Sequence, residues 1–211
     1  MIIDLLCTNS AHPVMVYLQK LQIPGHQVKI IHNISEAAGG DILFLVSCSD
    51  FVKKSTRDLY KKTLVLHASD LPHGRGWSPH IWTILRGENK IVVSLLEAAD
   101  KIDTGDIWKK ESVDLEGHEL FDEINNKVFK AEINLILWAV DNFNNVSPTP
   151  QPVVESISFE KRSPKDSEID MHKTLKESFN LLRVCDPDRF PAFFTYMGRD
   201  YKIKIEKIKK D

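Results

Sequence analysis

The chain has 211 residues, 42% of them hydrophobic, which is enough to bury the core of one domain. Its 28 basic and 30 acidic residues give a net charge of −2, and this balance argues against a broad nucleic-acid-binding surface. Three cysteines without histidine at metal-ligand spacing indicate reduced thiols in the cytoplasm and predict no metal site. No apolar run is long enough to cross a membrane, and the amino terminus does not resemble a signal peptide.

Short apolar segments alternate with amphipathic ones along most of the chain. Strands are expected at residues 2–7, 27–31, 41–46, 63–66, 90–96 and 106–113. Helices are expected at residues 12–21, 51–60, 78–85 and 120–143. Ser78 is expected to cap the third helix, with Pro79 in its first turn. This alternation predicts an α/β fold with a doubly wound, mostly parallel sheet.

Prolines at 148, 150 and 152 interrupt regular structure after the longest predicted helix. We expect one α/β domain over residues 1–146, a linker over 147–162 and a small C-terminal lobe over 163–211. The lobe is expected to contain a helix at residues 174–185 and a hairpin formed by residues 192–196 and 200–206. Tyr201, Ile203 and Ile205 give this hairpin an apolar face, which predicts a homodimer formed through the lobe.

Two nucleotide-binding motifs are missing from the sequence. Residues 8–11, which follow the first predicted strand, are Thr-Asn-Ser-Ala and lack the glycines that cradle a dinucleotide pyrophosphate. No Walker-type phosphate loop occurs in the chain either. These absences argue against enzymes that depend on NAD or ATP.

His67 is the strongest candidate for chemistry. It follows a buried strand at its carboxyl end, where open α/β sheets bind ligands, and it precedes a loop rich in proline and glycine. Asp103 comes just before Thr104-Gly105, in a turn that can return to the same edge of the sheet. An aspartate beside a histidine fixes its tautomer and stabilises the imidazolium formed on proton uptake. The pair therefore predicts a general base, although a histidine that only completes hydrogen bonds at a strand end is the simpler alternative.

Two segments together carry a family resemblance. Residues 67–79 read His-x-Ser-x-Leu-Pro-x-x-Arg-Gly-x-x-Pro, and residues 102–107 read Ile-Asp-Thr-Gly-Asp-Ile. In this order and interval they resemble the 10-formyltetrahydrofolate-dependent formyltransferases, which include methionyl-tRNA, glycinamide ribonucleotide and sugar-nucleotide N-formyltransferases. The resemblance implies a Rossmann-like catalytic domain over residues 1–146. It also implies direct formyl transfer from 10-formyltetrahydrofolate to an amine, without a metal, NAD or a covalent enzyme intermediate.

The resemblance implies roles for several residues. His67 is the general base and Asp103 orients it. The pterin is expected between two segments, one formed by Ser47, Cys48 and Ser49 and the other by Ala98, Ala99 and Asp100. Leu71 is expected to lie beside it. On the acceptor side, the resemblance and the chemistry of phosphate binding and ring stacking single out Arg75, Trp77 and Arg162.

Val65 departs from the family pattern, because the family has an asparagine two residues before the histidine. That amide is thought to help hold the oxyanion of the tetrahedral intermediate, and losing one such donor typically costs about 10²–10³ in rate. Either another donor serves, such as a backbone N–H, protonated His67, Ser69, Thr104 or a water molecule, or the protein is a slow or inactive relative.

The sequence also bears on the substrate whose amine accepts the formyl group. The C-terminal lobe is too short for a full tRNA-binding barrel, and the charge balance disfavours tRNA. We therefore expect an amino sugar carried on a nucleotide, in the synthesis of bacterial surface polysaccharide. The alternatives are a formyltransferase for another amine, such as methionyl-tRNA, and a catalytically silent protein that binds folate or sugar nucleotide.

Overall fold

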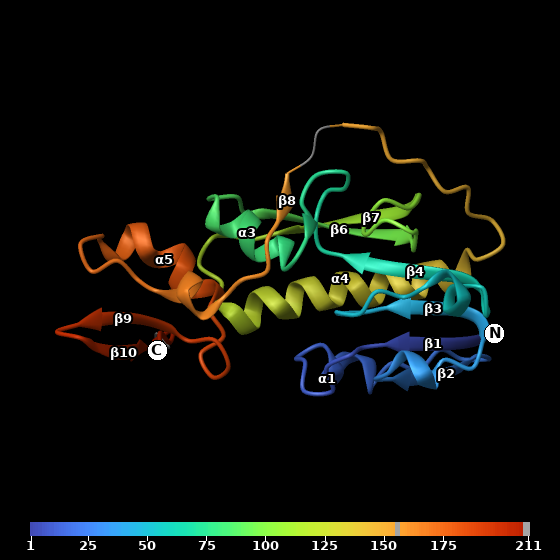
Figure 1. The fold of residues 1–211 in the computed structure, drawn as a ribbon, viewed down its shortest axis with the longest axis horizontal. Helices are drawn as coiled ribbons and strands as arrows, with labels where there is room; N and C mark the ends of the chain where they lie inside the picture. The colour runs from blue at the N-terminus through green and yellow to red at the C-terminus, as the bar shows by residue number, and fades with distance from the viewer. Residues whose placement is uncertain (155–156, 209–211) are drawn as a thin grey trace.

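A six-stranded mixed sheet forms the centre of the protein (Figure 1). The computed structural model describes residues 1–154 and 157–208. The strand order is β2-β1-β3-β4-β6-β7; the first four strands are parallel, whereas β6 runs antiparallel to β4 and to β7. Their bounds are β1 (Ile2–Leu6), β2 (Gln27–Ile31), β3 (Gly40–Leu45), β4 (Tyr60–His67), β6 (Lys90–Glu97) and β7 (Ile107–Asp114). The predicted α/β fold with a mostly parallel sheet is confirmed.

Helix α4 (Phe121–Asp141) lies along one face of this sheet (Figure 1). Its buried apolar residues recur at three- and four-residue steps, and they belong to the main core, which also contains Leu64 and Leu66, alternate residues of β4. Val65 lies between these two and packs against a smaller cluster on the opposite face. Since side chains alternate along a strand, Val65 shares its face of β4 with His67.

The early helices are shorter than predicted. Helix α1 (Met15–Leu18) and helix α2 (Lys54–Arg57) are single turns, where ten-residue helices were expected. Lys53 is extended just before α2, and β4 already begins at Tyr60, which is buried. Turns and irregular backbone therefore occupy most of residues 12–21 and 51–60 outside these single turns.

Helix α3 (Pro79–Leu85) has Pro79 in its first turn, as predicted, but the predicted cap at Ser78 is wrong. Ser78 has a φ of +46° and its side chain makes no capping hydrogen bond. A capping serine needs extended backbone to direct its hydroxyl at the first N–H groups of the helix, and the left-handed conformation removes that geometry.

The segment predicted as a linker contains a strand, β8 (Ser158–Phe159), which the sequence did not predict. It pairs in parallel with β5 (Arg75–Gly76) in the loop that follows His67. Trp77 donates its backbone N–H to the carbonyl of Phe159, 3.1 Å away. A C-terminal segment therefore lines the loop next to the candidate catalytic histidine.

The C-terminal residues form 3-10 helix η2 (Pro164–Ser167), helix α5 (Leu175–Val184) and a hairpin of β9 (Ala192–Tyr196) and β10 (Arg199–Ile203). Strand β10 is shorter than predicted, and Ile203 and Ile205 pack against the lobe's own small core. Tyr201 stacks on Phe194 with ring centroids 5.3 Å apart. The two isoleucines are therefore partly covered within the lobe, and dimerisation stays a prediction. Within the described residues, no helix combines the length and hydropathy of a membrane span.

Candidate functional site

His67 and Asp103 face each other at the edge of the sheet. His67 ends β4, and Asp103 lies in the turn between β6 and β7; both are buried, at 7% and 9% exposure. His67 Nδ1 lies 3.6 Å from Asp103 Oδ1, which is an ion-pair distance but too long for a hydrogen bond. The structure thus brings together the two residues that the sequence analysis paired.

The other ring nitrogen of His67 fixes the tautomer. Nε2 lies 2.9 Å from the carbonyl oxygen of Gly74. A carbonyl only accepts hydrogen bonds, so Nε2 must carry the proton. In a neutral ring the basic nitrogen is then Nδ1, beside Asp103, and a proton taken up there would lie between imidazole and carboxylate. The arrangement is suited to hold an imidazolium.

Asp103 is held from several sides. Its φ of +56° lies in the left-handed region, which is uncommon for residues other than glycine. The backbone N–H of Gly76 donates to Oδ2 at 3.1 Å. Arg75 Nε and Gln151 Nε2 donate to its backbone carbonyl at 3.1 and 3.0 Å. Arg75, predicted to bind the acceptor, therefore contacts the turn that carries Asp103, and Gln151 was not predicted to take part in the site.

The position of the missing amide is occupied by an apolar side chain. Val65 packs with Cys48 and Ala98 against the small apolar cluster, on the His67 face of β4. Among the replacement donors considered, Thr104 already donates its hydroxyl to the carbonyl of Lys101 at 2.9 Å. The Ser69 hydroxyl is buried and has no hydrogen-bond partner in the described part of the chain.

The two predicted pterin segments lie on the same side of the sheet, because Cys48 and Ala98 pack against one cluster. Ser47 has a φ of +50°, and the Ser49 hydroxyl lies 3.0 Å from that of Thr8. Burial raises the pKa of Cys48 to about 11, so the thiol stays protonated near neutral pH and is a poor nucleophile.

The second of these segments is fixed by Arg57. Its Nη1 donates to the Ala98 carbonyl at 2.8 Å, and its Nη2 pairs with Asp100, while Ala99 between them is partly exposed. Leu71, the remaining residue of the predicted pterin site, is buried at 1% exposure in the loop after His67.

On the acceptor side, Trp77 is 42% exposed, and the Lys161 ammonium lies 4.8 Å from its ring centroid. Arg162 donates from Nη2 to the carbonyl of Asp166 at 2.8 Å. Its Nε is buried without a hydrogen-bond partner among the described residues. A ligand oxygen would satisfy this donor.

Two histidines near this site were not predicted to be functional: His12 was not considered, and His80 was expected on a helix surface, where the structure instead buries its Nδ1. Burial lowers the pKa of His80 to about 4, and Coulombic interactions with His12, His67 and Arg162 add to the shift. Burial also lowers the pKa of His12 to about 4. His12, His67 and Arg162 are therefore electrostatic neighbours of His80. The available signal was that His12 lies in the loop beyond the carboxyl end of β1, whereas His67 is the last residue of β4.

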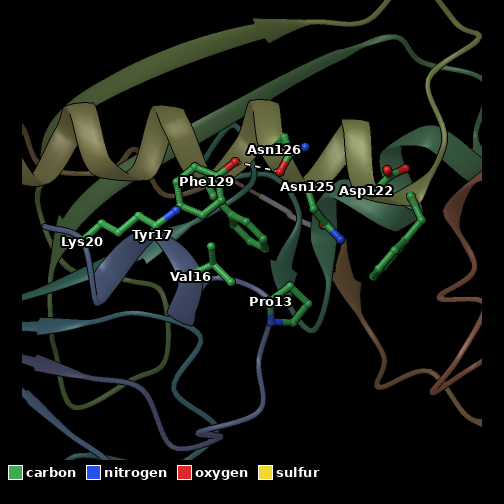
Figure 2. A pocket seen from close by; sticks show the side chains of 9 residues that line it. Pro13, Val16, Tyr17, Lys20, Asp122, Asn125, Asn126 and Phe129 are labelled. Atoms are coloured by element: carbon green, nitrogen blue, oxygen red, sulfur yellow. Dashed lines mark hydrogen bonds between the residues drawn. The ribbon is translucent and has the colours of Figure 1, made fainter.

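A hollow of about 380 Å³ lies between α1 and the first half of α4 (Figure 2). Tyr17 and Phe129 form part of its wall, and Tyr17 donates its hydroxyl to Asn126 Oδ1 at 2.7 Å. The Phe129 ring also contacts the His12 ring, with centroids 5.8 Å apart. The hollow thus adjoins the histidine that is an electrostatic neighbour of His80. No group of three or more potential metal ligands is found in residues 1–154 and 157–208.

Comparison with known proteins identifies the family. A family profile for formyl transferases matches residues 9–140. The methionyl-tRNA formyltransferase of Rickettsia africae (strain ESF-5) is 29% identical over 175 residues, which cover 82% of this chain and 57% of that protein. That of Clostridium acetobutylicum is 27% identical over 187 residues, which cover 87% and 59%. The chain thus spans less than two thirds of the length of these curated relatives.

Solved structures share the fold. A methionyl-tRNA formyltransferase from Clostridium thermocellum superposes with a TM-score of 0.82 at 25% identity, covering 99% of this chain and 94% of that chain. A 4-N formyltransferase from Francisella tularensis gives 0.74 at 20%, covering 99% and 98%. HypX from Aquifex aeolicus, in complex with tetrahydrofolic acid, gives 0.80 at 21%, covering 96% and 37%. The family profile covers more than half of the chain, and the protein belongs to the formyl transferase family.

Proposed function

We propose that the protein transfers a formyl group from 10-formyltetrahydrofolate to the amine of an amino sugar carried on a nucleotide. Members of the formyl transferase family use formyltetrahydrofolate as the formyl donor. The observation that carries the proposal is the buried His67–Asp103 pair, with a basic nitrogen facing a carboxylate. The pair supplies a base that can take a proton from a substrate amine while the enzyme stays free of covalent intermediates.

The reaction follows from this geometry. A neutral primary amine attacks the formyl carbon, a C–N bond forms, and the carbonyl electron pair moves to oxygen. The amine proton passes to His67 Nδ1, and Asp103 stabilises the imidazolium. When the intermediate collapses, the bond from carbon to N10 of the folate breaks. Its electron pair stays on N10, which takes the proton back from His67, and tetrahydrofolate leaves.

Three features support a nucleotide-linked acceptor. Arg162, which is permanently charged, and His67 both interact electrostatically with His80, and hydrogen-bond donors grouped in this way suit phosphate oxygens. The hollow between α1 and α4 offers aromatic and amide side chains suited to a planar heterocycle (Figure 2). The 4-N formyltransferase from Francisella tularensis shares the fold over nearly its whole length, with 99% of this chain and 98% of that chain superposed.

Methionyl-tRNA is the second candidate acceptor, favoured by the 29% identity with methionyl-tRNA formyltransferases. The net charge of −2 argues against it, since tRNA affinity depends on neutralised phosphates. A third possibility, binding without turnover, is motivated by Val65.

One experiment separates the three. The protein is incubated with 10-formyltetrahydrofolate and, in turn, UDP-, dTDP-, GDP- and CMP-linked amino sugars and methionyl-tRNA. Tetrahydrofolate release and formylated product are measured, and thermal shifts report binding. Turnover of one amino sugar, absent in His67→Asn, is the expected result. Turnover of methionyl-tRNA alone would select the second candidate, and thermal shifts without any turnover would select the silent protein.

A further inference from the structure

Gln151 connects the two motifs of the site. Its Nε2 donates to the backbone carbonyls of Asp103 and Gly105, at 3.0 and 2.8 Å. Its Oε1 accepts from Arg75 Nη2 at 2.9 Å. Arg75 Nε donates to the same Asp103 carbonyl at 3.1 Å. The side chain therefore uses both ends of its amide to join the turn of residues 103–105 to the loop after His67.

The turn needs such support. Asp103 adopts a left-handed conformation that few non-glycine residues occupy. Gly105 packs so closely against β6 that an added Cβ would lie 1.9 Å from the Glu97 carbonyl oxygen. The direction of the Asp103 carboxylate thus depends on a tightly constrained backbone. A rotation of this turn would change the 3.6 Å approach of Oδ1 to His67 Nδ1.

The backbone next to Gln151 is itself anchored to the sheet. Thr149 and Ile107, the first residue of β7, exchange two backbone hydrogen bonds of 2.8 Å each. Gln151 follows two residues later and is partly buried. A segment that lies after α4 in the chain is therefore held in place to present one amide to the catalytic turn.

We infer that Gln151 is a positioning residue, which sets the orientation of Asp103 toward His67 in the proposed formyl transfer. It acts through Asp103, in concert with Arg75, and not by touching the reacting atoms. The inference rests on the proposed function only for its kinetic consequence, because the effect on the His67 ring can be measured without any acceptor.

The first test is a double-mutant cycle of Gln151→Ala and Asp103→Asn. Val153→Ala is the matched control, because Val153 lies on the same segment with a fully exposed side chain. With 10-formyltetrahydrofolate and the amino sugar turned over fastest in the panel above, Gln151→Ala should lower kcat on the order of 10²-fold, as expected for a misplaced catalytic group. In the Asp103→Asn background it should cost less than about twofold more. Equal losses in both backgrounds would mean a merely structural role and would overturn the inference.

The second test needs no acceptor. Nitrogen-15 shifts of the His67 ring, measured at one pH near neutrality, report the protonation of Nδ1 and Nε2. Asp103→Asn should change them, Gln151→Ala should change them in the same direction, and Val153→Ala should leave them as in the wild type. Gln151→Glu keeps an acceptor for Arg75 but loses both donors, so it should behave like Gln151→Ala. Wild-type shifts in Gln151→Ala would overturn the inference.

The two tests separate the proposals. If Asp103→Asn leaves kcat unchanged, the proposed function of the pair is wrong, whatever the spectra show. If Asp103→Asn abolishes turnover while Gln151→Ala keeps wild-type kcat and wild-type ring shifts, the pair is catalytic and Gln151 does not position it.

Discussion

Replacing Glu132 with glutamine is expected to stabilise the protein, and more so as the pH rises from 5 to 8. Glu132 lies on α4 with 5% exposure, and its Oε2 has no hydrogen-bond partner among residues 1–154 and 157–208. Burial raises the pKa of this carboxyl to about 8 from an ordinary value of 4.5. Glutamine has nearly the same size and does not ionise, so the substitution isolates the effect of the charge.

Proton linkage determines how the contribution of Glu132 to the free energy of unfolding changes with pH. The folded chain holds this proton more tightly than the unfolded chain, so the contribution of Glu132 to stability is fully present below pH 4.5 and is lost as the pH rises to about 8. One pKa unit corresponds to about 1.4 kcal/mol, so the loss at pH 7 is roughly 3 kcal/mol. The advantage of glutamine should therefore be about 1 kcal/mol at pH 5 and roughly 3 kcal/mol at pH 7.

Urea unfolding at pH 5, 6, 7 and 8, followed by circular dichroism, measures the difference in free energy of unfolding. Glu119→Gln is the control, because it is expected to change the free energy of unfolding in the opposite direction. Burial opposes the ionisation of Glu119, but Lys127 and backbone N–H groups outweigh it and lower its pKa to about 2. This variant should be destabilised at every pH of the series. The reasoning fails if the advantage of Glu132→Gln is the same at pH 5 and pH 8.

Three further predictions concern the site. His67→Asn and Asp103→Asn should each lower kcat by about 10²–10⁴-fold with an unchanged melting temperature, and tetrahydrofolate release at the wild-type rate by either would contradict their assignment. Val65→Asn should raise kcat by up to about 10²-fold, because it adds an amide on the His67 face of β4; an unchanged kcat in a folded variant would point to another donor or to a silent protein. Gly105→Ala should reduce the free energy of unfolding by about 1–3 kcal/mol, since its Cβ would meet the Glu97 carbonyl; urea unfolding identical to the wild type would disprove this.

The sheet and the central pair were predictable because their signals are local. Apolar strands, the periodicity of α4 and the spacing of the two motifs are all read along the chain, and the structure brings His67 and Asp103 together. Helices α1 and α2 were overestimated because local periodicity does not report a chain that turns early into the next strand.

The supporting residues were not predictable in the same way. Gln151 contacts Asp103 across 48 positions of sequence, and nothing in its own surroundings marks it as functional. Arg75 looked like a phosphate ligand because arginine often is one, but its contacts with Asp103 and Gln151 are set by the tertiary fold. His80 likewise owes its lowered pKa first to burial and then to electrostatic neighbours that the fold assembles.

The pairing of β5 with β8 has a consequence for the limits of the catalytic unit. Phe159 covers Gly74 and Gly76 so closely that a methyl group on either glycine would collide with it. Gly74 in turn supplies the oxygen that binds His67 Nε2. A truncation after α4 would keep the central sheet and both residues of the pair, yet it would strip one wall from the loop that selects the histidine tautomer. A shortened chain that keeps this wall of the loop therefore has to extend beyond the sheet to at least Phe159.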